Sequence, residues 1–193
     1  MRPGARRVAE VSEEELIDYA APTLAGLKTG SLFTSKHTSE EEIRQDVRRL
    51  NRMLSPKGLV LVPMSKKNGR VLLYLYRKSR LDRDLLDEEA VKILRERGYR
   101  RITPGACVAE LICRLRREGA FPHEIGLFLG YPPDDVRGFM DHRDVGCKCV
   151  GTWKVYGDAA AAQKAFARYR RCTEIYGRCY SRGRSVEQMI VAG

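Results

Sequence analysis

The sequence predicts an α+β fold: a mainly helical single domain with a small antiparallel sheet packed on helices. Apolar residues recur at helical spacing in several segments, and capping or turn residues mark their ends. Between these segments, residues 58–77 contain two apolar runs rich in β-forming residues. The chain has 193 residues, 43% of them hydrophobic and 32% charged, which is enough for one sizeable core. We therefore expect one globular domain over residues 12–180.

The first segment after the N-terminus predicts a short helix. Ser12 is followed by three glutamates, an acidic start that suits the positive end of a helix dipole. Pro22 is expected to end this helix, because proline lacks the backbone N–H that a helix interior needs. In residues 23–34, leucines alternate with two glycines, which favours a strand or a loop.

The next two elements have the clearest local patterns. Ser39 and Glu42 form a capping box, and apolar residues then recur at helical spacing up to Pro56. Asn68 and Gly69 join the two apolar runs that follow, and this pair supplies the positive φ angles of a type I′ turn. The patterns predict an amphipathic helix followed by a β-hairpin over about residues 58–77.

The second half of the chain is predicted to be mostly helical. Residues 80–97 and 103–117 each show apolar residues at helical spacing, and Pro104 is well placed for a first helical turn. Asp158 is placed to cap a long final helix. Residues 181–193 are expected to form a C-terminal tail, with a short helix as one alternative.

Composition indicates a cytoplasmic protein without a membrane partner. The longest apolar runs are far shorter than the roughly 18–20 residues that cross a bilayer. Residues 1–11 are basic and have no apolar stretch behind them, so they predict a flexible terminus and not a secretory signal. The net charge of +11 favours nucleic acid, acidic partners or anionic surfaces, although solubility alone would also explain it.

The densest candidate for function is residues 121–139, where two interpretations compete. The spacing of Ile125, Gly130 and Val136 suits a helix-turn-helix-like segment over about residues 122–141. Its second helix begins with Pro133, Asp134 and Asp135, however, and these two carboxylates stand where a recognition helix would meet phosphates and bases. The spacing therefore favours the geometry more than it favours sequence-specific DNA binding.

The other interpretation takes His123 and Glu124 as a general acid/base or ligand pair at a helix start. Adjacent residues on a helix point in different directions, so His123 as a cap or a buried hydrogen-bonding residue is the simpler alternative. We place the candidate binding site where His123, Glu124, Tyr131 and Trp153 converge, with Tyr156 as a further candidate.

The final helix supplies the candidate nucleic-acid residues. One of its faces is apolar, and the other carries four cations: Lys164, Arg168, Arg171 and Arg178. A charged helix face is most often simply solvated, and this interpretation remains open beside the basic stripe. The chain has no P-loop, dinucleotide-binding glycine fingerprint or nucleophile elbow, which disfavours the common nucleotide enzymes.

The cysteines fall into two groups. Cys107 and Cys113 lie in an apolar helical pattern and are expected in the core. Cys147 and Cys149 flank a lysine, which favours reactive thiols or a soft-metal site if a cysteine of the final helix lies nearby. Because this spacing is not a zinc motif, the two thiols are only weak candidates for metal ligands.

Three phrases of the chain are distinctive. They are PTLAGLK (22–28) with SLF (31–33), FPHEIG (121–126) running on to LGYP (129–132), DV (135–136) and GF (138–139), and WKVYG (153–157). Together they resemble a family known as domain of unknown function 3793, seen mostly in anaerobic or gut-dwelling bacteria, over about residues 22–172. The resemblance brings no reaction or cofactor with it, but the family's gene neighbourhoods imply an iron- or redox-linked role and a redox or iron-handling protein partner. Cys147 and Cys149 are not part of the family pattern.

Three functional hypotheses follow from these observations. The leading one is a cytoplasmic binding or accessory protein, iron- or redox-linked, with an unknown cofactor. The first alternative is a nucleic-acid-binding protein that uses the helix-turn-helix-like segment and the basic final helix. The second alternative is an enzyme with a His/Glu site.

Overall fold

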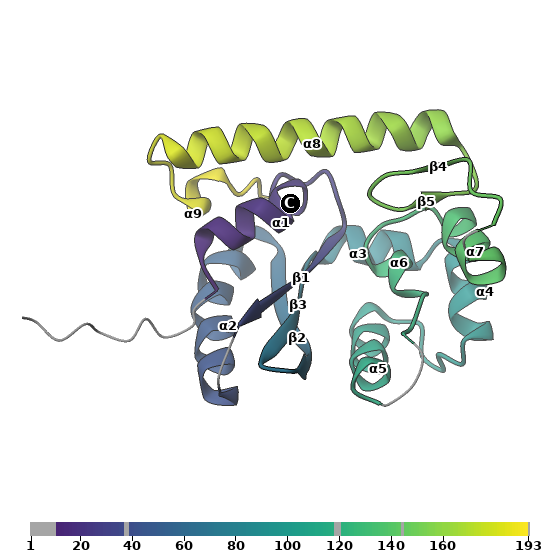
Figure 1. Ribbon diagram of the computed structural model, residues 1–193. Helices are drawn as coiled ribbons and strands as arrows, with labels where there is room; N and C mark the ends of the chain where they lie inside the picture. Colours follow the sequence, from purple (N-terminus) through teal and green to yellow (C-terminus); the bar gives the residue numbers. More distant parts are fainter. Residues whose placement is uncertain (1–10, 37–38, 118–120, 144, 193) are drawn as a thin grey trace, which may run out of the picture.

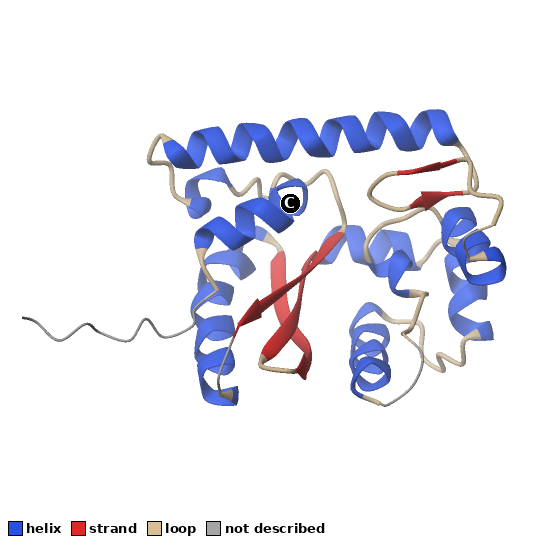
Figure 2. Cartoon of the chain, in the orientation of Figure 1, coloured by secondary structure: helices blue, strands red, loops and turns tan. Residues whose placement is uncertain are grey.

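A computed structural model describes residues 11–36, 39–117, 121–143 and 145–192. Helices dominate it, and the strands form a three-stranded antiparallel sheet and a separate two-stranded one (Figure 2). The long helix α8 (Ala159–Ser181) runs along one side of the molecule, from the small hairpin at one end to α9 (Val186–Met189) at the other (Figure 1). The predicted α+β class, mainly helical with a small antiparallel sheet, is confirmed.

Helix α1 (Glu13–Leu24) begins at a capping box made by Ser12 and Glu15. The prediction that Pro22 ends this helix is wrong, because the helix continues for two more residues. Its last turn is fully buried, and the buried guanidinium of Arg77 donates to the carbonyls of Thr23 and Leu24 at 2.7 and 2.5 Å. These bonds satisfy carbonyls that a helix end leaves unpaired, and they offset the amide bond that Pro22 cannot make.

The central sheet is built around the predicted hairpin. β2 (Leu59–Lys67) and β3 (Arg70–Arg77) pair through a turn in which Asn68 and Gly69 both have positive φ. β1 (Gly30–Lys36) pairs with the other edge of β3, so the strand order is β1-β3-β2. α2 (Glu40–Leu54), with its predicted capping box, leads through a short 3-10 turn, η1 (Ser55–Lys57), into β2.

Both faces of the central strand are covered by helices. Its side chains alternate between two hydrophobic clusters: Val71, Leu73 and Leu75 lie in one, and Leu72, Tyr74 and Tyr76 lie in the other. The first cluster packs against α1, α2 and the C-terminal segment, where Val186, Met189 and Ile190 are buried. Burial on both faces explains why β3 is a continuous apolar run and not an alternating one.

The second cluster is enclosed by five shorter helices. They are α3 (Lys78–Leu85), α4 (Glu88–Glu96), α5 (Pro104–Arg116), α6 (Ile125–Phe128) and α7 (Pro133–His142). The single helix expected over residues 80–97 is therefore wrong, since the chain forms two helices there. Asp87 accepts hydrogen bonds from the backbone N–H groups of Glu89 and Ala90, and this N-cap starts a second helix in the middle of one apolar pattern.

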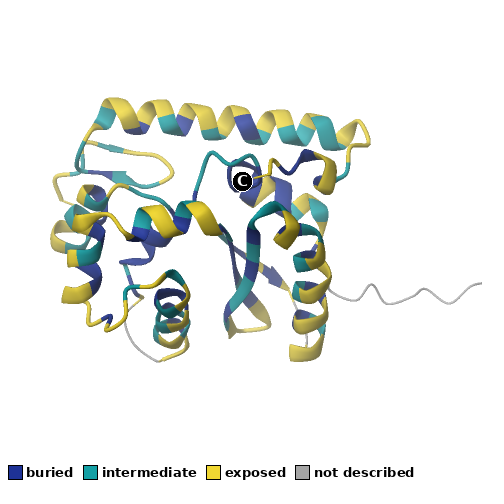
Figure 3. Cartoon of the chain, turned by 180° about the vertical axis from the view of Figure 1, so that it is seen from behind, coloured by how far each residue is buried: buried dark blue, intermediate teal, exposed yellow. Residues whose placement is uncertain are grey.

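A third, smaller cluster joins the two-stranded sheet to the beginning of α8. β4 (Cys149–Val150) and β5 (Lys154–Val155) form a short antiparallel pair, and Trp153 and Val155 pack against Phe166 of α8. Asp158 caps α8 as predicted, accepting from the backbone N–H groups of Ala160 and Ala161. The outer side of α8 is exposed along most of its length (Figure 3).

Candidate functional site

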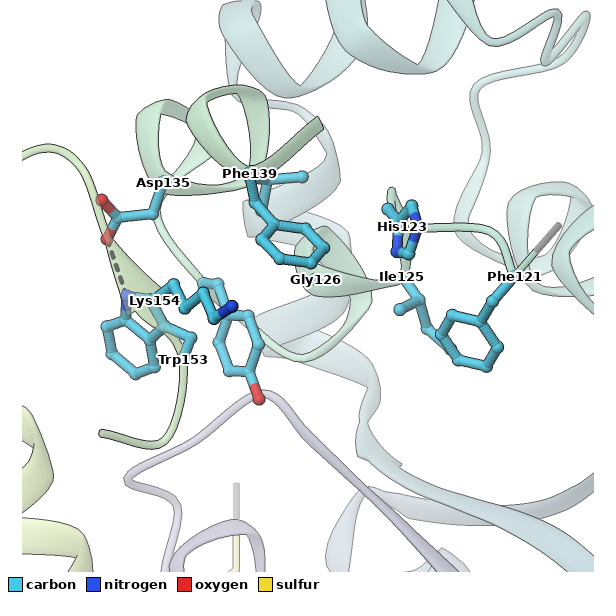
Figure 4. Close-up of a pocket in the computed structure, with 10 residues that line it drawn as sticks. Phe121, His123, Ile125, Gly126, Asp135, Phe139, Trp153 and Lys154 are labelled. Atoms are coloured by element: carbon cyan, nitrogen blue, oxygen red, sulfur yellow. Dashed lines mark hydrogen bonds between the residues drawn. The ribbon is translucent and has the colours of Figure 1, made fainter. Parts of the chain in front are cut away.

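A cavity of about 280 Å³ lies between α6, α7 and the loop that joins β4 to β5. Its walls are mainly rings, and we refer to it as the aromatic pocket, defined by Phe121, His123, Tyr131, Phe139 and Trp153 (Figure 4). The remaining lining comes from Ile125, Gly126, Asp135, Val136 and Lys154. Ligand pockets commonly range over roughly 300–1,000 Å³, so this cavity suits a small ligand such as a single ring system.

The rings around the pocket contact one another in two groups, one that contains His123 and Phe139 and one that contains Tyr131 and Trp153. His123 meets Phe139 edge to face, with ring centres 5.0 Å apart. Tyr131 stacks on Trp153 at 4.7 Å, and Trp153 in turn meets Phe166 edge to face at 4.5 Å. Such pairs add stability beyond the burial of their area, so the walls are held in place before any ligand enters.

Asp135 fixes the orientation of Trp153. Its buried carboxylate accepts a hydrogen bond from the indole Nε1 of Trp153 at 2.7 Å, drawn as a dashed line in Figure 4. It also accepts from the backbone N–H groups of Tyr156 and Gly157, each at 2.7 Å. Three donors to one buried carboxylate offset the cost of its burial, and they tie both the β4–β5 loop and the residues after β5 to α7.

Two glycines allow the segments around the pocket to approach closely. Gly130, in the turn between α6 and α7, has φ +77, and a Cβ there would lie 2.5 Å from the Thr29 Oγ1. At Gly138 on α7, a Cβ would lie 2.4 Å from Cγ of Tyr156. Both positions therefore need glycine, the first for its backbone angle as well as for space.

Lys154 supplies a positive charge at the pocket. Its Nζ lies 5.6 Å from the centre of the Phe139 ring, within reach of a cation–π contact. Burial raises the pKa of Tyr131 to about 12, so this phenol stays neutral, and its hydroxyl donates to the Thr152 carbonyl at 3.3 Å. Apolar ring faces with a cation beside them suit a flat ligand that carries a negative group.

The structure brings only some of the predicted site residues together. His123, Tyr131 and Trp153 line the aromatic pocket as a group. Tyr156 lies outside its lining, with its ring against Gly138 and its hydroxyl donating to the carbonyl of Arg143.

Glu124 turns away from His123 into the core, where it has no exposed surface. Its carboxylate accepts a hydrogen bond from the Tyr99 hydroxyl at 3.2 Å. Arg114 and Arg97 approach it at 3.5 and 3.6 Å. The contacts join α4, α5 and α6, so Glu124 holds helices together beneath the pocket and does not face a ligand in it.

The structure confirms one of the two cysteines predicted to lie in the core and contradicts the other. Cys107 is buried as expected, whereas Cys113 is exposed because it falls on the solvent side of α5, so that prediction is wrong. Cys147 and Cys149 are both half-buried. Within the described parts of the chain, no group of three or more His, Cys, Asp and Glu side chains has the geometry of a metal site.

The four candidate cations of the final helix, Lys164, Arg168, Arg171 and Arg178, are all exposed. The segment predicted to be helix-turn-helix-like contains α6, a single turn of four residues, and α7 of ten residues. Arg137 of α7 pairs with Glu96 of α4 at 2.8 Å. α7 is thus flanked by α4 on one side and by the β4–β5 loop on the other.

Fold and site together define a class: an α+β protein with a small, preformed pocket of aromatic side chains. The model of the family described as "Protein of unknown function (DUF3793)" matches residues 16–190, and the chain belongs to this family. The resemblance seen in the three phrases is thereby confirmed, and the phrases that line the pocket lie inside the match. No curated protein and no solved structure matches the chain. In the described residues, no helix has both the length and the apolar character needed to cross a membrane.

Proposed function

We propose that this protein is a binding protein that holds a small, flat, negatively charged ligand in the aromatic pocket. The observation that carries the proposal is the ring of aromatic side chains around one cavity of about 280 Å³, with Lys154 beside it. Flat apolar walls favour a planar ligand, and a cation over the Phe139 ring favours a carboxylate or similar group on it. The pocket's small volume favours one or two fused rings.

The proposal places the protein in the cytoplasm of a bacterium, as its composition and its family resemblance imply. It serves there as a binding or accessory protein. The iron- or redox-linked role stays a prediction from the resemblance. An enzyme with a joint His123 and Glu124 site has less support, because Glu124 is buried and only His123 lines the pocket.

The test of the proposal uses Trp153, which is the one tryptophan of the chain. A ¹H–¹⁵N spectrum therefore contains one indole N–H signal, and it reports on the pocket wall directly. Titration with 2-naphthoate is expected to shift this signal in a saturable way. The neutral compound 2-naphthol is expected to bind more weakly, because it lacks the charge that pairs with Lys154.

Replacing Phe139 with alanine should weaken 2-naphthoate binding by about tenfold, the loss expected for one ring contact of roughly 1.4 kcal/mol. Tyr19→Ala is the matched control, because Tyr19 is an aromatic residue, 56% exposed, outside the aromatic pocket. It should leave the affinity unchanged. Equal affinities for wild type and Phe139→Ala would contradict the proposal.

The exposed cations of α8 support a second candidate function, nucleic-acid binding. Lys164, Arg168, Arg171 and Arg178 lie on one helix of a chain with net charge +11. Binding through phosphate contacts would weaken steeply with rising salt. A filter-binding series with a short DNA duplex and a matched RNA tests this candidate: Arg171→Gln together with Arg178→Gln should reduce both affinity and salt dependence. Absence of binding at low salt removes it.

A further inference from the structure

A second cavity, of about 320 Å³, lies where four segments of the chain meet. Its walls come from the loop between α1 and β1, from α3, from the turn between α6 and α7, and from the middle of α8. Figure 1 shows α8 passing over this loop and over α3. Tyr131 lines this cavity as well as the aromatic pocket, and the other lining residues of the two cavities differ.

More cationic than anionic side chains line the second cavity. Four cations line it: Lys28, Arg80, Arg83 and Arg168. Of its two carboxylates, Asp84 pairs with Arg83 at 2.7 Å and also accepts from the Thr29 hydroxyl. Asp87 accepts from the backbone at the start of α4. Neither carboxylate pairs with one of the other three cations.

Lys28, Arg80 and Arg168 make no hydrogen bond or ion pair within the described part of the chain. The Nζ of Lys28 lies 5.3 Å from the centre of the Tyr131 ring, and burial lowers the pKa of Lys28 to about 8. A half-buried ammonium without a counter-ion costs folding free energy. A cluster of unpaired cations in a cavity lowers the stability of the fold, and such clusters are typical of binding sites.

We propose that this cavity binds the phosphate group of a small phosphorylated molecule, with Lys28, Arg80 and Arg168 as its cationic ligands. Two guanidinium groups and an ammonium match the geometry and the charge of a phosphate. The Tyr169 hydroxyl, beside Arg80 and Arg168, adds a further donor. The volume leaves room for part of the molecule that carries the phosphate. The site is separate from the aromatic pocket, so the inference goes beyond the function proposed above.

The experiment measures binding of inorganic phosphate and pyrophosphate to the full chain by isothermal titration calorimetry at low ionic strength. Wild type is expected to bind one equivalent. Lys28→Met and Arg168→Gln should each weaken the association by about tenfold or more, because each removes a charge-assisted contact. Arg178→Gln is the matched control on the same helix, and it should bind like wild type because Arg178 lies outside the cavity.

Thermal unfolding of the same variants separates a binding role from a structural one. Lys28→Met should be at least as stable as wild type in the absence of phosphate, since it removes an unpaired, half-buried charge and keeps the side-chain length. Arg168 is exposed, so Arg168→Gln should also fold normally. Added phosphate should raise the melting temperature of wild type and of Arg178→Gln, and it should raise that of Lys28→Met less.

Three results would overturn the proposal. The first is that neither phosphate nor pyrophosphate binds wild type. The second is that Lys28→Met and Arg168→Gln bind them as wild type does. The third is that a short DNA duplex binds and loses affinity equally in Arg168→Gln and Arg178→Gln, while Lys28→Met has no effect. That last result would assign Arg168 to a basic surface that contacts nucleic acid.

Discussion

Replacing Asp135 with alanine is expected to lower the free energy of unfolding by about 3 kcal/mol and to abolish ligand binding in the aromatic pocket. The substitution leaves three donors without their acceptor, namely the Trp153 indole and the backbone N–H groups of Tyr156 and Gly157. These bonds attach the β4–β5 loop and the residues after β5 to α7, so the wall formed by Trp153 should become mobile. Denaturant unfolding gives the stability, and a red shift of Trp153 fluorescence reports the loss of its packing.

Asp135→Asn is the matched variant, because an amide has the same shape and can still accept from the two backbone groups. Its NH₂ group would then face the indole N–H of Trp153, donor against donor. We expect roughly half of the stability loss, together with the same displacement of Trp153. Wild-type stability and an unchanged emission spectrum in Asp135→Ala would show that this carboxylate does not hold the loop.

The second large effect is expected at Glu124. Glu124→Ala should lower the free energy of unfolding by about 3 kcal/mol, because it leaves the Tyr99 hydroxyl and two guanidinium groups without their shared partner. Arg97 is 49% exposed, so water can partly replace its contact, whereas Arg114, at 22%, is less accessible. Chemical denaturation of the purified variant measures this loss.

Ligand affinity distinguishes a structural role for Glu124 from a role in the pocket. Glu124→Gln keeps an acceptor for Tyr99 and should be intermediate in stability, while its folded form binds 2-naphthoate with wild-type affinity. A variant that is fully stable but does not bind 2-naphthoate would place the Glu124 carboxylate in the binding site. It would also contradict the assignment of Glu124 to the core.

Local patterns predicted most of the fold. The β2–β3 hairpin follows from the Asn68–Gly69 turn, and the start of α8 follows from Asp158, because each signal lies within a few residues of the structure it produces. The two helix errors have different causes. The outcome at Pro22 depends on tertiary contacts with Arg77, which the sequence around Pro22 does not show. At Asp87 the signal is a local N-cap, but it lies inside a continuous apolar pattern that predicted one helix.

The candidate site was predicted in part, for a similar reason. His123, Tyr131 and Trp153 stand out in the sequence as unusual residues, and they do lie around one cavity. The role of Asp135 was missed, because its three hydrogen-bond donors come from a later part of the chain. Trp153, Tyr156 and Gly157 lie 18, 21 and 22 positions after Asp135, and only folding brings them to its carboxylate. From the sequence, this carboxylate was expected on the surface of a recognition helix, where it would repel DNA phosphates. In the structure the carboxylate is buried.

The second cavity was not predicted from the sequence, although Arg168 was already a candidate for anion contacts. Lys28, Arg80 and Arg168 are scattered over the length of a basic chain, and only the folding of α8 over the α1–β1 loop brings them together. The chain has 36 lysines and arginines, so the sequence alone does not distinguish these three from the other cations. The net charge of +11 favoured an anionic partner or solubility alone, and the second cavity is where we propose that a phosphate group binds.

The most direct measurement of the central claim is an intermolecular nuclear Overhauser spectrum of the protein with saturating 2-naphthoate. Binding in the aromatic pocket predicts cross-peaks from the naphthalene protons to the rings of Tyr131, Phe139 and Trp153, which lie around one cavity. Saturable binding with cross-peaks only to Tyr19 and Phe33, which stack on each other elsewhere, would contradict it.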